Sequence, residues 1–271
     1  MKVKQIMFLA LVINDTIALA QEFPLGVRAQ ALSAASVAKG RDAEALFANP
    51  ALLAGIPGLS FTAFYSHPFG IKELRLSSFS TSASLASLAL GAAVVDFGNA
   101  LYRDRWYHLA ISRNVLPKRR LALGLGAMLR HLRIAGYGDD SAMLLNLGTQ
   151  LRLSELLTLG SAISNFLNAT IGQQQEKLPR SACLGFAYAP TATLTLQTEV
   201  YKQNNFPEEW RLGIEANPLA PLLLRTGIGT NPDRLTFGLA LRLLKINLQF
   251  AAFSHTDLGW TQQFAVTFMS R

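Results

Sequence analysis

Residues 233–243, DRLTFGLALRL, decide the fold of this 271-residue chain. Apolar side chains occupy every second position from Leu235 to Leu241, and Arg234 and Arg242 lie on the opposite side. A period of two is typical of a β-strand with one apolar face and one polar face. The last third of the chain is therefore predicted to be a ladder of strands. The same alternation recurs in 192–202, 209–216, 245–253 and 260–268.

From residue 59 onward, the alternation and the turn residues predict about fourteen strands, long enough to cross a bilayer when tilted. Tight turns, such as the one expected at Thr81 and Ser82, alternate with longer polar loops such as 167–179. That sorting is typical of outer-membrane barrels. Residues 59–271 are thus predicted to form an antiparallel transmembrane β-barrel, an all-β fold. The expected strands are 59–66, 72–80, 83–96, 105–113, 119–131, 141–153, 156–166, 180–189, 192–202, 209–216, 220–229, 233–243, 245–253 and 260–269.

The first residues have the pattern of a cleavable export signal. Lysines precede an apolar run over 6–13, and Ala-Leu-Ala at 18–20 forms a cleavage site, so 1–20 is predicted to be a signal peptide. No later stretch reaches the roughly 18 apolar residues of a transmembrane helix. The chain is then either a soluble periplasmic β-protein or a membrane barrel, and the alternation favours a barrel in the bacterial outer membrane. An even number of strands places both termini on the periplasmic side.

Residues 21–58 do not alternate, and they are predicted to form a short helical segment before the barrel. Asp42 is positioned to cap one short helix. Asn49 is positioned to cap a second, with Pro50 at its first position and Gly55 at its end.

The polar faces of the expected strands carry many small residues, among them Gly160, Gly185 and Gly227. A wide water-filled pore has no need of them, so we expect segment 21–58 to fold into the lumen as a plug. Charged residues face the same lumen and form either a polar track for an anionic head group or a ladder of cross-strand ion pairs. Such pairs contribute about 0.2–1 kcal/mol each, and the ladder is the favoured alternative. These residues are Glu199, Arg211, Glu215, Arg225, Arg234, Arg242 and Lys245.

Aromatic residues near the expected strand ends fit the membrane interfaces, which Trp and Tyr prefer. Packing in a core or a loop is the alternative. The residues are Tyr65, Tyr102, Trp106, Tyr107, Tyr137, Tyr188, Tyr201, Trp210 and Trp260.

The chain has a formal net charge of +8, but its Lys and Arg are scattered through the strands. Nucleic-acid binding is therefore not predicted, and contact with lipid head groups accounts for the charge as well. The histidines lack the spacing of zinc ligands, and the turn at 254–257 is too tight for a catalytic triad. The sequence predicts no enzyme, catalytic residue, metal or cofactor. Cys183, the single cysteine, is expected to be a buried structural thiol.

A motif near the start of the chain carries a family resemblance. An acidic residue precedes Ala-x-Ala-Leu and then Asn-Pro-Ala, at Asp42, Ala43, Ala45, Leu46, Asn49, Pro50 and Ala51. Together with the closing hairpins over 232–241 and 254–264, this opening resembles PorV/PorQ-type outer-membrane barrels, which are relatives of the FadL-like long-chain fatty-acid transporters. The resemblance implies that residues 21–58 fold into the barrel, with Asp42, Leu46, Asn49, Pro50 and Ala51 as the plug motif.

The end of the chain departs from that family. Its members usually end on an aromatic residue, whereas Met269, Ser270 and Arg271 follow Phe268 here. This difference bears on recognition by the barrel-insertion machinery, which is an expected partner during assembly.

Two function classes follow from these observations. The first is passive transport of small hydrophobic molecules through a plugged barrel. The second is a PorV/PorQ-like partner barrel of a protein secretion system, which holds or delivers exported proteins without transporting anything itself. Outer-membrane lipid is an expected partner in both, whereas a hydrophobic small molecule belongs to the first class and exported proteins to the second.

Overall fold

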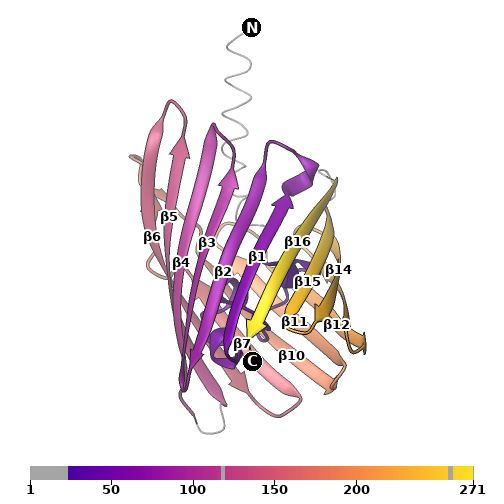
Figure 1. The fold of residues 1–271 in the computed structure, drawn as a ribbon. Helices are drawn as coiled ribbons and strands as arrows, with labels where there is room; N and C mark the ends of the chain where they lie inside the picture. Colours follow the sequence, from indigo (N-terminus) through magenta and orange to yellow (C-terminus); the bar gives the residue numbers. More distant parts are fainter. Residues whose placement is uncertain (1–23, 117–119, 256–258, 271) are drawn as a thin grey trace.

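A computed structural model describes residues 24–116, 120–255 and 259–270, so the predicted signal peptide at 1–20 lies outside the described residues. Fourteen antiparallel strands close into one barrel, and each pairs with its neighbours along the chain (Figure 1). Two further short strands, β8 and β9, form a separate hairpin in the connection between β7 and β10. The first and last barrel strands pair from Leu59 with Ser270 to His67 with Gln262, which closes the sheet and leaves it without an edge. The predicted fourteen-stranded antiparallel barrel is confirmed.

The strand boundaries lie close to those expected from the alternation. The strands are β1 (Leu59–His67), β2 (Arg75–Leu85), β3 (Leu88–Gly98), β4 (Tyr102–Asn114), β5 (Leu121–Ile134), β6 (Gly138–Arg152), β7 (Leu157–Ser164), β8 (Thr170–Ile171), β9 (Glu176–Lys177), β10 (Ser181–Thr191), β11 (Leu194–Gln203), β12 (Glu209–Leu219), β13 (Leu222–Gly229), β14 (Arg234–Leu243), β15 (Ile246–His255) and β16 (Gly259–Ser270).

The two faces of each strand have opposite environments. On β14, Leu235 and Phe237 point outward and are 42% and 45% exposed, whereas Thr236 and Ala240 between and beyond them are fully buried. Successive strand residues point to opposite sides of a sheet, so this pattern sets an apolar outer surface against a filled interior. Large outward residues such as Leu109 continue the apolar surface around the barrel.

Three of the predicted turns are misplaced. Thr81 and Ser82 lie inside β2, and the chain reverses at Ala86 and Ser87, where Ala86 has a φ of 53°. Small Ser and Ala residues blur the two faces of β2, which hides its true end in the sequence. Two further turns fall later than predicted: residues 190–191 lie inside β10 and 217–219 lie inside β12, and the chain reverses at 192–193 and 220–221. The short connections share one end of the barrel with both ends of the closed sheet. The longest loop, which carries β8 and β9, lies at the opposite end.

Residues 24–58, here called the lumen segment, pack against the inward faces of the barrel (Figure 1). They form α2 (Val27–Ala31), α3 (Ala45–Ala48) and the 3-10 helix η1 (Pro50–Gly55), and a further 3-10 helix, η2 (Pro68–Gly70), follows β1. None of the helices in the described residues has the length and apolar character needed to cross a membrane.

Candidate functional site

The lumen segment meets two different walls of the barrel. The inward faces of β3–β6, here called the small-residue wall, carry Gly91, Ala110, Gly124 and Gly148. A Cβ added to Gly124 would overlap the backbone of Ala51, and one added to Gly148 would overlap Asn49. Glycine is therefore required at these positions because the backbone of η1 lies directly against the sheet.

Asn49 fixes the start of η1, as the sequence predicts. Its Oδ1 accepts a hydrogen bond of 2.9 Å from Ala51 N, and its Nδ2 donates 2.8 Å bonds to Val37 O and Thr149 O. Asn49 is fully buried, so one side chain caps the helix and ties it to both the lumen segment and β6.

The predicted helix cap at Asp42 differs in detail. The helix α3 begins at Ala45 with Glu44 at its N-cap position, and no side chain caps it. Asp42 instead accepts a 3.1 Å hydrogen bond from Glu44 N, in a turn that precedes the helix. Its other oxygen accepts from Gln249 Nε2 at 3.2 Å, so Asp42 joins the lumen segment to β15. Aspartate favours such local turns, which compete with capping.

The inward faces of β11–β15, here called the polar wall, hold the lumen segment by ion pairs. Glu215 accepts hydrogen bonds from Arg28 at 3.1 Å, Arg41 at 2.6 Å and Arg225 at 2.8 Å. Arg28 and Arg41 belong to the lumen segment, whereas Arg225 belongs to β13. Arg225 also donates to Gln249, which continues the network to β15. Glu215 is therefore the point where three guanidinium groups converge.

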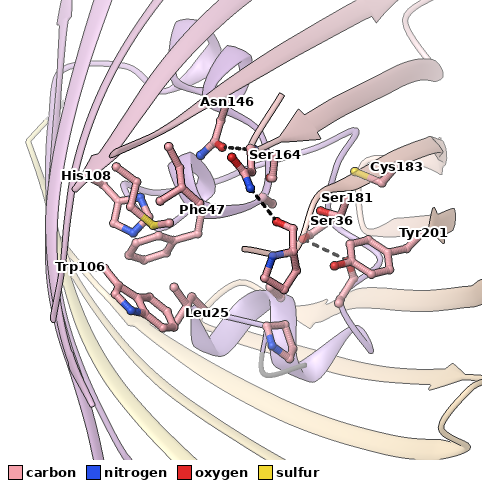
Figure 2. Close-up of a pocket in the computed structure, with 18 of the residues that line it drawn as sticks. Leu25, Ser36, Phe47, Trp106, His108, Asn146, Ser164, Ser181, Cys183 and Tyr201 are labelled. Carbon is pink, nitrogen blue, oxygen red and sulfur yellow. Dashed lines mark hydrogen bonds between the residues drawn. The ribbon is translucent and has the colours of Figure 1, made fainter. Parts of the chain in front are cut away.

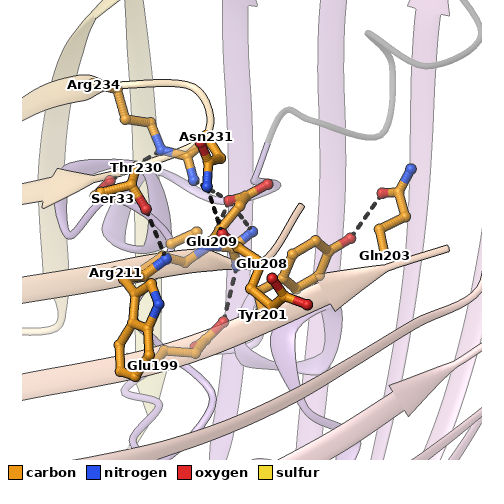
Figure 3. Close-up of polar contacts among 12 residues, drawn as sticks. Ser33, Glu199, Tyr201, Gln203, Glu208, Glu209, Arg211, Thr230, Asn231 and Arg234 are labelled. Carbon is orange, nitrogen blue, oxygen red and sulfur yellow. Dashed lines mark hydrogen bonds and ion pairs between the residues drawn. The ribbon is translucent and has the colours of Figure 1, made fainter. Parts of the chain in front are cut away.

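A second cluster on the polar wall lies nearer the long loops (Figure 3). Glu209 accepts from Arg211 at 2.7 Å and from Arg234 at 2.6 Å, and Arg211 also pairs with Glu199 at 2.9 Å. Glu199 accepts 3.0 Å bonds from the backbone N–H groups of Ser36 and Val37. The cluster thus holds the backbone of the lumen segment as well as balancing its own charges.

Five of the seven predicted track residues come together in these two clusters: Glu199, Arg211, Glu215, Arg225 and Arg234. Lys245 does not join them, because the two-residue turn at Leu244, with a φ of 53°, ends β14 and leaves Lys245 exposed. Arg242 is half-buried near the same turn. The sequence reasoning missed Glu209, which shares the inward parity of Arg211 and could have been found from it. It also missed Arg28 and Arg41, which lie in a segment without periodicity.

Glu44 is a buried carboxyl group inside the lumen segment. Its Oε2 accepts a 3.1 Å hydrogen bond from Val27 N, while its Oε1 has no partner among the described residues. Burial, and then the charge of Asp42, raise the pKa of Glu44 well above its usual range. The group is therefore favoured in its neutral form.

A cavity of about 200 Å³ lies between the lumen segment and the inward side of the strands, in the half of the barrel toward the long loops (Figure 2). One side is largely apolar, formed by Leu25 and Phe47 of the lumen segment with Trp106, Met128 and Leu144. His108 and Arg130 belong to the same side. The opposite side is polar and includes Ser36, Asn146, Ser164, Ser181, Glu199, Tyr201 and Arg211. An apolar cavity with a few polar groups is the usual form of a small-molecule site.

The cavity also corrects two interpretations of the aromatic residues. Trp106 is 6% exposed and lines the cavity, and Tyr201 lines it from the other side with the Arg211 guanidinium 3.9 Å from its ring centre. Neither faces a membrane interface, because both occupy inward positions of their strands. Trp210 and Trp260 are outward and 62% and 51% exposed.

Cys183 is half-buried rather than buried. It lines the same cavity, and its thiol lies 3.7 Å from Ala162 O.

Comparisons with known proteins find similar folds among solved structures. No family model matches the chain, and no curated protein matches it. Among solved structures, the chain is similar to the P. putida toluene transporter TodX, with a TM-score of 0.62 and 13% identity over 89% of this chain and 95% of that chain. A Pseudomonas aeruginosa FadL homologue has a TM-score of 0.62 and 11% identity over 89% of this chain and 97% of that one. At these identities the likeness shows that the chain shares the FadL-like barrel fold. The resemblance to PorV/PorQ-type barrels stays a prediction.

Proposed function

We propose that this protein is an outer-membrane barrel for the passive transport of small hydrophobic molecules, with the cavity as its binding site. The observation that carries the proposal is a cavity inside the barrel with one largely apolar side, closed in part by the lumen segment. In the proposed orientation the long loops face outward, and the short turns and both termini face the periplasm. The structural neighbours named as a toluene transporter and a FadL homologue support the proposal, as does the apolar outer surface.

In this proposal the lumen segment acts as a plug. Ion pairs at Glu215 and hydrogen bonds at Glu199 and Asn49 hold it across the lumen, so water has no wide path. Single-channel recording in planar bilayers tests this part. We expect low conductance, and a large steady conductance of the intact protein would exclude the plug.

Ligand binding is tested by the fluorescence of Trp106 in a protein that carries Trp210→Phe and Trp260→Phe, so that only the cavity residue reports. Toluene is expected to change this fluorescence in a saturable way. In Ala29→Phe a larger side chain fills the cavity from α2 and should abolish the change. Ala127→Phe, on the outward face of β5, is the matched control and should bind as before. Equal binding by both variants would place the ligand elsewhere.

Transport itself is tested by the uptake of radiolabelled toluene into cells that carry either variant. Ala29→Phe is expected to slow uptake, and Ala127→Phe is not. The partner-barrel alternative stays a prediction from the family resemblance, since the cavity gives it no support. Co-purification of exported proteins with a barrel that binds no small molecule would favour that alternative.

A further inference from the structure

The outer wall of the barrel carries an apolar depression over β2, β3, β4 and β5, which lie side by side in Figure 1. Its volume is about 490 Å³. One row of outward side chains that line it, aligned from strand to strand, is mostly small: Thr81, Ala92, Leu109 and Ala127. The adjacent row toward the long loops is large and exposed: Phe79, Val94, Tyr107 and Leu129. The depression is therefore a gap in the apolar outer surface, and its lining suits a hydrocarbon chain.

The depression does not continue into the lumen. Gly91 lies on the inward side of β3, where an added Cβ would meet Leu53 of η1 at 2.6 Å. Ala110, on the inward side of β4, packs in the same cluster as Leu53. The two strands pair without a break in register from Leu88 to Gly98 of β3. The wall behind the depression is closed, so its occupant comes from the membrane side.

Arg113 lies on the same outward face, toward the short turns. The outward side chains of β4 follow in the order Leu109, Ile111 and Arg113, and successive ones are about 7 Å apart along the strand. Arg113 is exposed and is the penultimate residue of β4. Among the described residues its side chain has no hydrogen bond or ion pair. An unpaired guanidinium group thus lies at the short-turn end of the depression.

Two more arginines lie at this end of the wall. Arg120 precedes β5, Arg152 ends β6, and the Arg152 backbone N–H donates a 2.7 Å hydrogen bond to Arg120 O. Both side chains are exposed, and in the part of the chain that the structure describes neither has an ion pair. Glu155 is the only acidic residue among the described residues of the turns at this end of β2–β7. The local charge is therefore positive.

These observations define a ligand with an anionic head and an apolar tail. Guanidinium groups bind phosphate oxygens through charge-assisted hydrogen bonds. Basic residues at a membrane surface attract anionic lipids. A second copy of the chain is a poorer occupant, because a two-fold interface presents the same patch from both subunits and would bring the unpaired arginines together. A phospholipid supplies both the missing charge and the chain.

We propose that the depression and Arg113 form a binding site for an anionic phospholipid of the phosphatidylglycerol type. The phosphate lies at Arg113, and an acyl chain passes Ile111 and fills the depression beside Ala92 and Ala127. Arg120 and Arg152 add positive charge near the head group. The inference rests on the proposed function only for the place of the barrel in an outer membrane, with the short turns in the periplasmic leaflet. It makes no use of the cavity.

Native mass spectrometry of the protein in mild detergent measures the Kd of the first lipid that binds. The probes are phosphatidylglycerol and phosphatidylcholine with the same acyl chains, so only the head group differs. One basic residue at a membrane surface changes the affinity for an anionic lipid about fivefold. We therefore expect phosphatidylglycerol to bind at least about fivefold more tightly than phosphatidylcholine.

Two variants at position 113 assign this preference to the arginine. Arg113→Gln should lower the ratio of the phosphatidylcholine Kd to the phosphatidylglycerol Kd about fivefold. Arg113→Lys keeps the charge and should keep most of the preference. Lys245→Gln is the matched control, because it removes one exposed positive charge at the same end of the barrel, in the turn between β14 and β15. It should leave the ratio unchanged.

The depression is tested by two variants that fill it from different strands, Ala92→Phe in β3 and Ala127→Phe in β5. Each should weaken the binding of both lipids and leave their ratio unchanged, since the acyl chains are the same. Ala29→Phe fills the cavity inside the barrel and should bind both lipids as the unmodified protein does. Heat-modifiable migration on gels verifies that each variant has folded as a barrel.

The outcomes separate the inference from the proposed function. Equal affinity for the two lipids overturns the inference, and so does an equal loss of preference in Arg113→Gln and Lys245→Gln. Unchanged lipid binding in both filled variants overturns it as well. A dimer in the mass spectrum that Ala127→Phe dissociates would assign the depression to a second copy instead. Each of these results leaves toluene binding at Trp106 intact, whereas a failure of toluene to bind removes the proposed cavity site and leaves the lipid site in place.

Discussion

The polar wall holds the lumen segment by charge, at Glu215 and Glu199, whereas the small-residue wall holds it by close approach, at Gly124 and Gly148. Ion pairs have long reach and specify which residues face each other. Packing against glycine acts only at van der Waals distance, but the missing side chain lets the helix backbone lie directly against the sheet. The segment is therefore positioned by one wall and packed by the other.

The cavity lies between the two kinds of contact. Phe47 and Trp106 belong to its apolar side, while Glu199 and Arg211 belong to its polar side. The comparison predicts that damage to the polar wall releases the segment, whereas damage to the small-residue wall displaces it.

The largest effect is expected for Glu215→Gln. The substitution leaves Arg28, Arg41 and Arg225 without their shared carboxylate, and removal of one partner of a buried ion pair costs about 3–5 kcal/mol. The free energy of unfolding in urea should fall by that amount, and conductance should rise as the segment loosens. Glu176→Gln, at an exposed site in β9, is the control. Equal stability of the two variants would show that charge does not hold the segment.

A smaller loss is expected for Gly124→Ala. The new methyl group overlaps the backbone of Ala51, and overpacking of this kind costs about 1–3 kcal/mol. Gly126→Ala is the matched control, since it lies on the same face of β5 and its added Cβ meets Asn146 at an ordinary 3.6 Å. Urea unfolding of both variants measures the difference. If Gly126→Ala is the more damaging, η1 does not lie against β5 as described.

Asn49 separates capping from cross-linking. Asn49→Asp keeps the oxygen that accepts from Ala51 N but loses the donors to Val37 O and Thr149 O, whereas Asn49→Ala loses all three bonds. Loss of the cap alone is worth about 1 kcal/mol. The free energy of unfolding of Asn49→Ala should therefore be lower than that of Asn49→Asp by about that much. The comparison is made at a pH where the introduced carboxyl group still accepts the hydrogen bond from Ala51 N. The reverse order would mean that the buried charge outweighs the cap.

The barrel could be predicted from the sequence because each strand shows the two-residue alternation on its own, without knowledge of its neighbours. Leu235 and Phe237 point outward, as their alternation with polar or small residues predicts. The same parity places Glu199, Arg211 and Glu215 on one inward surface, although it does not say which of them pair. The turn after β2 was misplaced because Ser and Ala suit both faces.

The cavity could not be predicted from the sequence. Its lining combines strands far apart in the chain with a segment that has no period, and Phe47, Trp106 and His108 become neighbours only when the barrel has closed. Trp106 was assigned to the membrane interface because residue type was weighed above parity. Trp106 has an even number, as His108 does, and the even-numbered residues of β4 point inward.

The stability of the protein should depend on pH through Glu44, a residue of the lumen segment and of neither wall. The pKa of Glu44 is raised by burial in the folded protein, whereas an unfolded glutamate titrates near pH 4.3. Above about pH 4.3 the unfolded chain releases a proton that the folded chain keeps, so stability is greatest below that pH and falls as the pH rises toward the folded pKa. Glu44→Gln cannot ionise, and the difference in unfolding free energy between it and the unmodified protein should grow with pH. Parallel curves from pH 4 to pH 8 would show that Glu44 is not held neutral.

The smallest expected effect concerns Cys183, which lines the cavity but takes no part in holding the segment. Because it is the single cysteine, a small maleimide reports on this position alone. At a toluene concentration equal to its Kd, half of the sites are occupied, and the labelling rate should fall about twofold. A Cys183→Ala, Ser87→Cys protein, labelled at the exposed turn after β2, should show no protection. Protection at both positions would mean that toluene acts on the reagent or the detergent. Protection at Cys183 alone would place the ligand between the two walls.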